Sequence, residues 1–314
     1  MRPLPILVLT AGLCFLLGAG AEKAAPPAAS VLATATEPDA AAMKSIEAFA
    51  AAGFGQIASG SPEEVKEARK TLAALLRKPE CTLVFYNAFL KAAKPSMDPI
   101  LSSGDGFRAT NALMVLRQVK SPEAVTLMLE QCNAGKQKLV SVRIAGGSML
   151  AAMINGKALP VTESDRVARS IRENLESETS ALAAARSMEA LAALSTAAEN
   201  AKMAAQARGA LNELIASATV VANRTSQAGS EDFAGALFRG LIGIRDQCVK
   251  MPQAEQSALG GNEPLKELLG KVNALQVPAS GRTADAAREL AAARAVADAL
   301  SQMVGLSKPK PAKK

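Results

Sequence analysis

Residues 107–116 read FRATNALMVL, and residues 142–150 read VRIAGGSML. In both stretches a large apolar residue precedes an arginine (Arg108 or Arg143), and a run of small residues ending in leucine follows. The two arginines are 35 residues apart, and a third, weaker copy begins at Ala185. A repeat of this length accommodates one pair of helices, and such pairs are stable when each buries its apolar face on the next. The repeat therefore predicts stacked helix pairs.

From about residue 39 onward, the apolar residues have the spacing of amphipathic helices. Helix starts are marked by a hydroxyl residue followed by proline and glutamate, at Ser61 and again at Ser121. Breaks are expected at Pro95 and Gly135, among others. No segment alternates long enough to indicate a strand. The sequence therefore predicts an all-α protein of about eleven or twelve helices, joined by short loops that make neighbours antiparallel.

The run from Arg108 to Leu150 resembles a HEAT-type repeat of the armadillo-like α-solenoid family. Its first helix has an arginine near the start, and its second helix begins with the Pro-Glu-Ala-Val segment at 122–125. The resemblance is clearest over residues 60–160 and is only compositional beyond them. It implies an α-solenoid of stacked antiparallel helix hairpins with a concave partner-binding surface, and it carries over no catalytic residue. The alternative fold is an irregular multi-helix bundle.

The two ends of the chain differ from its middle. Residues 1–21 have the pattern of a signal peptide, with Arg2, an apolar stretch and a final small-residue segment. We expect a flexible Ala/Pro-rich leader over 22–38, a helical-repeat domain over 39–306 and a basic disordered tail over 307–314. The mature chain is accordingly expected to be exported to the periplasm or the extracellular space, with no transmembrane segment.

Composition excludes much catalytic chemistry. The chain has no histidine, which removes Ser-His and Cys-His pairs and His-ligated metal sites. Cys81, Cys132 and Cys248 lie on apolar stripes and are predicted to be buried thiols, with a Cys81–Cys132 disulfide as the alternative. The formal charge of +7 falls to about +2 without the signal segment and tail, so a nucleic-acid partner is not expected. We predict no catalytic residue, no cofactor and no metal.

Arg108, Arg117 and Arg143 are the candidate partner-binding residues. The segment 105–143 holds six Lys or Arg against three Asp or Glu, and arginine pairs well with carboxylates. The alternative for Arg108 and Arg143 is a structural role, in which they bridge acidic groups or helix ends of adjacent repeats.

These observations predict an exported, non-catalytic scaffold that binds a protein or peptide on its concave face. One alternative is an envelope-associated structural protein whose Lys-rich tail makes a weak contact with an anionic surface. Another is a carboxylate-based hydrolase. The acidic run at Glu173, Glu176 and Glu178 is interpreted instead as a solvated helix face and loop. Sugar sites usually stack their ligand on Trp or Tyr, and the chain has one Tyr and no Trp.

Overall fold

The computed structural model describes residues 24–227, 233–275 and 284–306. Every regular element in these ranges is helical, with 14 α-helices, one short 3₁₀ turn and no strand. The predicted all-α class is therefore confirmed. The predicted signal peptide (1–21) and basic tail (307–314) lie outside the described residues.

The helices follow one another closely along the chain. Their bounds are α1 (Ala29–Leu32), α2 (Ala40–Ser59), α3 (Pro62–Leu76), α4 (Leu83–Ser102), α5 (Gly106–Leu116), α6 (Pro122–Gln131), α7 (Val140–Asn155), α8 (Ser164–Ser177), α9 (Ala181–Asn200), α10 (Ala204–Thr225), α11 (Ala234–Lys250), α12 (Gln253–Leu259), α13 (Glu263–Ala274) and α14 (Ala284–Met303). The short helices α1 and α12 raise the number above the eleven or twelve that the sequence predicts.

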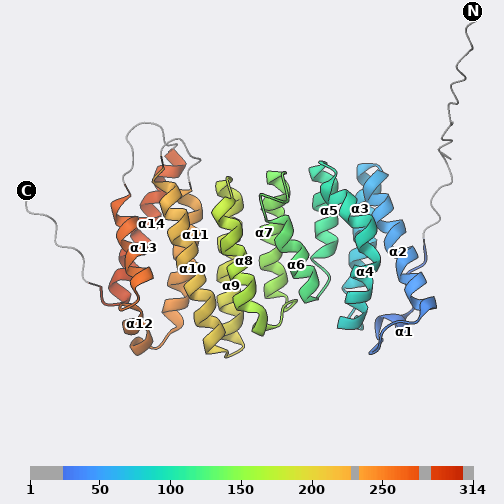
Figure 1. The fold of residues 1–314 in the computed structure, drawn as a ribbon, viewed down its shortest axis with the longest axis horizontal. Helices are drawn as coiled ribbons and strands as arrows, with labels where there is room; N and C mark the ends of the chain where they lie inside the picture. The colour runs from blue at the N-terminus through green and yellow to red at the C-terminus, as the bar shows by residue number, and fades with distance from the viewer. Residues whose placement is uncertain (1–23, 228–232, 276–283, 307–314) are drawn as a thin grey trace, which may run out of the picture.

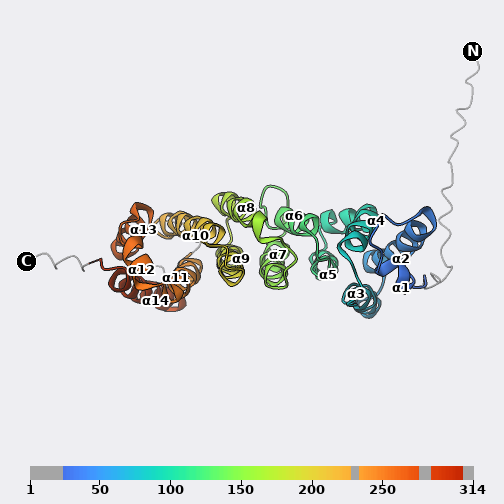
Figure 2. The same ribbon diagram turned by 90° about the horizontal axis from the view of Figure 1, so that it is seen from below.

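The helices are arranged in chain order along one axis, as Figure 1 shows. Figure 2 shows two rows: the first row holds α3, α5, α7, α9, α11 and α14, and the second row holds α4, α6, α8, α10 and α13. Each first-row helix packs on the next helix of that row, and most also pack on a second-row neighbour. All first-row helices run the same way, so they begin at the upper edge of Figure 1 and end at its lower edge.

The first row is curved. In Figure 2, α7 and α9 at its middle are set back from α3 and α14 at its two ends. The outer face of the first row is therefore shallowly concave, and α5, α7 and α9 form its centre.

The predicted helix starts at Ser61 and Ser121 are confirmed. Ser61 forms a reciprocal capping box with Glu64, and the Ser121 hydroxyl accepts the backbone N–H of Ala124. These contacts satisfy N–H groups that have no partner inside the helix. The same short signals therefore define the starts of α3 and α6.

The predicted break at Pro95 is wrong, because α4 continues through both Pro95 and Pro99. Proline removes one helical hydrogen bond and leaves a carbonyl without its donor. Both prolines are exposed, as is Lys91, whose carbonyl loses its donor at Pro95. Water can solvate that carbonyl, while buried Phe89 and Met97 hold the opposite side of the helix in the core.

Packing begins before residue 39, earlier than the predicted boundary of the helical domain. Leu32 at the end of α1 is fully buried. The backbone N–H of Thr82 donates to the Leu32 carbonyl at 3.1 Å, and the Thr82 hydroxyl donates to the Thr34 carbonyl at 2.6 Å. Part of the segment expected to be a flexible leader is therefore joined to the start of α4, because a single large apolar residue anchors it in the core.

The three cysteines in the described ranges are free thiols, so the disulfide alternative for Cys81 and Cys132 is not what the structure has. Cys132 and Cys248 are buried as predicted, whereas Cys81 is partly exposed. Burial raises the pKa of the Cys132 thiol to about 12, which keeps it protonated at neutral pH.

Candidate partner-binding surface

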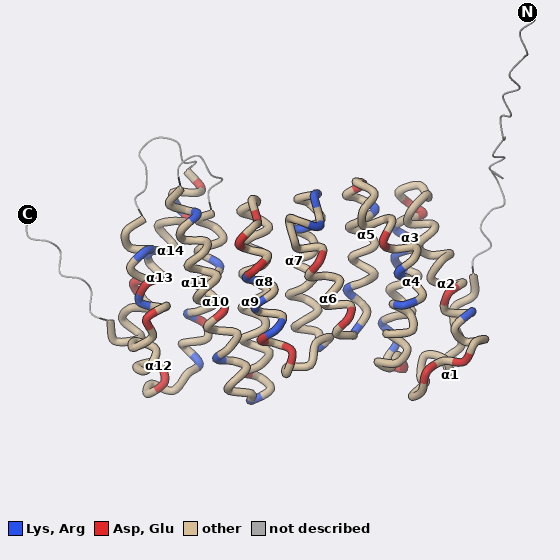
Figure 3. The backbone as a smooth tube through the Cα atoms, in the orientation of Figure 1, with Lys and Arg blue, Asp and Glu red and all other residues tan. Residues whose placement is uncertain are grey.

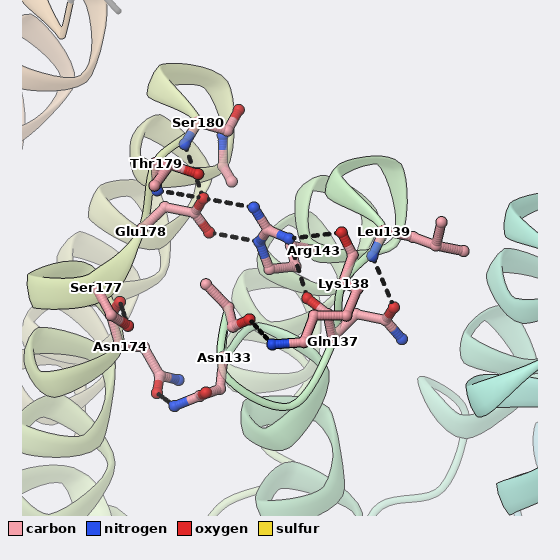
Figure 4. A network of polar contacts seen from close by, with 12 residues as sticks. Asn133, Gln137, Lys138, Leu139, Arg143, Asn174, Ser177, Glu178, Thr179 and Ser180 are labelled. Atoms are coloured by element: carbon pink, nitrogen blue, oxygen red, sulfur yellow. Dashed lines mark hydrogen bonds and ion pairs between the residues drawn. The ribbon is translucent and has the colours of Figure 1, made fainter. Parts of the chain in front are cut away.

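Arg143 lies at the centre of a buried polar network (Figure 4). Its side chain is 4% exposed and that of its partner Glu178 is 3% exposed. Nε and Nη2 of Arg143 each donate to one carboxylate oxygen of Glu178 at 2.8 Å. Nη1 donates to the carbonyls of Gln137 and Lys138 at 2.9 and 3.2 Å. The guanidinium therefore joins α7 and the loop before it to the loop between α8 and α9.

Glu178 is held from the other side as well. Its Oε1 accepts the backbone N–H groups of Thr179 and Ser180, both at 2.8 Å. Arg224 of α10 donates to the carbonyls of Glu178 and Glu176. The prediction that Glu178 belongs to a solvated loop is therefore wrong, because Arg143 of α7 and two backbone donors stabilise its charge in the core.

The other two acids of that run are exposed as predicted. Glu176 pairs with Arg172 one helical turn away at 2.7 Å, and Glu173 lies on the open side of α8. Only Glu178, at the end of the helix, turns inward.

Arg108 also bonds to a helix end. Its Nη1 and Nη2 donate to the carbonyls of Ile57 and Gly60 at 2.9 and 3.2 Å, at the end of α2. Its Nε pairs with Asp105 at 3.0 Å. Asp105 in turn accepts the backbone N–H of Arg108 at the start of α5, and this hydrogen bond lowers the pKa of the Asp105 carboxyl. A cation at a helix C-terminus stabilises the unpaired carbonyls there.

The three candidate arginines therefore do not form one site. Arg108 and Arg143 have the structural role that the sequence offered as the alternative, and the burial of Arg143 leaves it no surface for a partner. Arg117 is different, since it caps the other end of α5, at the lower edge, and its side chain is exposed.

Helix α7, at the middle of the first row, carries little charge. Figure 3 shows α7 as largely uncharged, and the buried Arg143 is the one charged residue in its sequence. The solvent-facing side of α7 presents small and apolar residues instead, among them Ile144, Ser148 and Ala152. A helix that is apolar on every side is normally covered on every side.

Three large apolar side chains are exposed where α5, α7 and α9 begin. Phe107, Val140 and Leu182 are 45%, 42% and 50% exposed, and each is the first or second residue of its helix. We call these three residues the apolar edge. They lie on three successive helices of the first row, at the upper edge of Figure 1.

Close helix contacts hold the apolar edge together. A Cβ on Gly106 would lie 2.9 Å from the Ser141 hydroxyl, so the first turns of α5 and α7 are in contact. A Cβ on Gly147 would lie 2.8 Å from the Cβ of Arg186, which leaves room only for glycine between α7 and α9. The small residues of the repeat thus bring the three helix starts side by side.

Sequence reasoning missed the apolar edge. Aligning the repeats on their arginines matches Phe107 with Val142, which is fully buried. The residue of α7 that is exposed like Phe107 is Val140, which comes two positions before Val142. The arginine alignment misses it because α5 begins two residues before Arg108 and α7 begins three residues before Arg143. The only available signal was a large apolar residue close to each predicted helix start.

The described part of the chain contains no group of three or more Cys, Asp and Glu side chains placed to hold a metal ion. Nor does it contain a helix of the length and hydropathy that crossing a bilayer requires. No protein-family model and no curated protein matches this sequence.

Proposed function

We propose that this protein is an α-solenoid of the HEAT or armadillo type that acts as a non-catalytic scaffold and binds a helix of a partner protein across the apolar edge. The observation that carries the proposal is the exposure of Phe107, Val140 and Leu182 at the starts of three adjacent helices.

The solenoid part of the proposal is supported by the pattern of helix contacts. Nearly all packing connects helices that are one, two or three positions apart in chain order. In a globular bundle, helices far apart in the chain would also meet around one centre. Packing limited to near neighbours is typical of stacked repeats.

The binding part is supported by repetition. A single exposed apolar side chain is ordinary on a protein surface. Here three of them follow one another along one edge, beside the uncharged side of α7. Such a surface is costly to leave in water, so a partner that covers it gains apolar burial.

The spacing of the row favours a helical partner. Packed helices lie about 8–10 Å apart, and seven residues of an α-helix span about 10.5 Å. A partner helix that crosses the starts of α5, α7 and α9 can therefore place apolar side chains at i, i+7 and i+14 against Phe107, Val140 and Leu182. We further propose, from the expected signal segment at 1–21, that this binding takes place outside the cytoplasm.

The test compares capture of exported proteins of the source cells by the immobilised wild-type chain and two variants. The first variant carries Phe107→Ser, Val140→Ser and Leu182→Ser. The matched control is Val249→Ser. It removes a 60% exposed apolar side chain near the C-terminal end of α11, away from the helix starts that form the apolar edge. We expect a specific partner to bind the wild type and the control and to be lost from the triple variant. Equal capture by all three proteins would contradict the proposal.

A further inference from the structure

A second surface lies at the lower edge, where α3 and α5 end. Arg77 and Lys78 follow α3, and Arg117 and Lys120 follow α5. All four side chains are exposed. We call these four residues the basic corner.

The two turns of the basic corner are joined to each other. Nε of Arg77 donates to Oε1 of Gln118 at 3.0 Å, which ties the end of α3 to the end of α5. Between the two turns lies the partly exposed Cys81 thiol, whose pKa is raised by burial and by the charge of Glu80, against the smaller lowering effect of Lys78 and Lys120. The Arg77–Gln118 hydrogen bond is therefore the contact that places the two turns side by side.

The positive charge of the basic corner is largely uncompensated. Within the described ranges, Lys78, Arg117 and Lys120 make no ion pair and donate no side-chain hydrogen bond, and the acid in these turns is Glu80. Arg77 and Arg117 occupy helix C-caps, but neither side chain is bonded to the last carbonyls of its helix. Arg108 differs from them, because its Nη1 and Nη2 donate hydrogen bonds to carbonyls at the end of α2.

An exposed apolar side chain follows the first of these turns. Leu83 is the first residue of α4, directly after the turn that holds Cys81, and it is 52% exposed. A small-anion site needs converging donors, whereas the basic corner offers exposed cations on two turns and a nearby exposed leucine in the sequence.

We propose that the basic corner binds an acidic segment of a partner protein, whose carboxylates pair with the four cations and whose apolar side chain covers Leu83. A flat anionic surface fits less well. Along the same edge such a surface would meet the exposed acids Glu123, Asp165 and Glu255 as well as the exposed Lys157 and Lys202, whereas a short acidic segment can contact the basic corner alone. The basic corner is at the opposite end of α5 from Phe107, so it is separate from the apolar edge.

The test uses a fluorescein-labelled oligoglutamate peptide with one leucine, titrated with the full-length protein and followed by fluorescence anisotropy. The corner variant replaces the four cations by glutamine. The matched control makes the same change in net charge at four exposed lysines elsewhere: Lys44, Lys66, Lys91 and Lys202. An exposed ion pair changes an equilibrium by roughly 1.4- to 5-fold, so the corner variant should bind about tenfold more weakly or worse. The control should bind within about twofold of the wild type.

Two further variants keep the test independent of folding. Arg117→Glu reverses one charge and should weaken peptide binding more than Arg117→Gln does. Leu83→Ser should weaken binding of the leucine-containing peptide but not of a plain oligoglutamate. Circular dichroism of each variant should remain that of the wild type, since all the changes are on the surface.

Three results would overturn the proposal. The wild type does not bind the acidic peptide; the corner variant and the control lose affinity equally, which indicates net charge alone; or inorganic phosphate or phosphatidylglycerol vesicles bind the basic corner while the peptide does not. Each result leaves the apolar edge untouched, so it is distinguishable from failure of the scaffold proposal.

Discussion

Removal of the Arg143 side chain tests whether the buried network holds α7 to the loop between α8 and α9. The Glu178 side chain is 3% exposed in the wild type. Arg143→Ala leaves its carboxylate with only two hydrogen-bond donors, the backbone N–H groups of Thr179 and Ser180. It also leaves the carbonyls of Gln137 and Lys138 without the donors they now have. Removal of one member of a buried ion pair destabilises a protein by about 3–5 kcal/mol. We therefore expect Arg143→Ala to lower the free energy of unfolding by about 4 kcal/mol.

A loss of this size is easily measured by thermal unfolding. For a chain of this length, each kcal/mol lowers the melting temperature by roughly 1.5 °C, so Arg143→Ala should melt about 6 °C lower by circular dichroism. The matched control is Arg117→Ala, which removes an exposed arginine with no ion pair and should change stability by no more than about 0.5 kcal/mol.

A double-mutant cycle isolates the pair itself. If Arg143 and Glu178 stabilise each other, Arg143→Ala combined with Glu178→Ala should cost about 2–3 kcal/mol less than the sum of the two single changes. Hydrogen exchange should increase in the loops before α7 and before α9, which the guanidinium joins. A melting temperature within about 2 °C of the wild type, or strict additivity in the cycle, would refute the reasoning.

Three other predictions follow from buried or strained positions. Leu32→Ala should lower the free energy of unfolding by about 3 kcal/mol, because Leu32 is fully buried; a change below about 1 kcal/mol in chemical denaturation would show that the segment before α2 is not anchored. Lys157 and Lys202 have positive φ, 59° and 58°, which costs a residue with a side chain roughly 1 kcal/mol. Glycine at either position should therefore raise the melting temperature, and a decrease would count against this. Iodoacetamide at mildly alkaline pH should label Cys81 in the folded chain and Cys132 only after unfolding, because burial raises the pKa of Cys132 to about 12; peptide mass spectrometry that finds both labelled in the folded chain contradicts it.

Local features of the fold were predictable from the sequence. The starts at Ser61 and Ser121 depend on a side-chain oxygen that reaches a backbone N–H three residues later, and such contacts need no distant partner. The helix break predicted at Pro95 was wrong because the outcome there depends on tertiary packing and not on local sequence. Whether a proline ends a helix depends on whether its freed carbonyl meets water or the core, and this depends on how α4 packs.

The candidate site was only partly predictable. The similarity of the two stretches identified Arg108 and Arg143 as related positions, and the structure gives both of them structural hydrogen bonds to residues of neighbouring helices and loops. The burial of Glu178 was not predictable, because its partner is 35 residues away in the sequence. The apolar edge was missed because alignment by arginine does not follow the helix starts.

The sequence by itself determined the helical class, the helix caps at Ser61 and Ser121, and the absence of imidazole chemistry, since each depends on residue type or on neighbours within a few positions. Only the tertiary structure decided which charges are buried and which apolar residues stay exposed. Those outcomes depend on the lateral contact of neighbouring helices, whose touching residues are tens of positions apart in the sequence, and on whether a desolvated charge finds its counter-ion there.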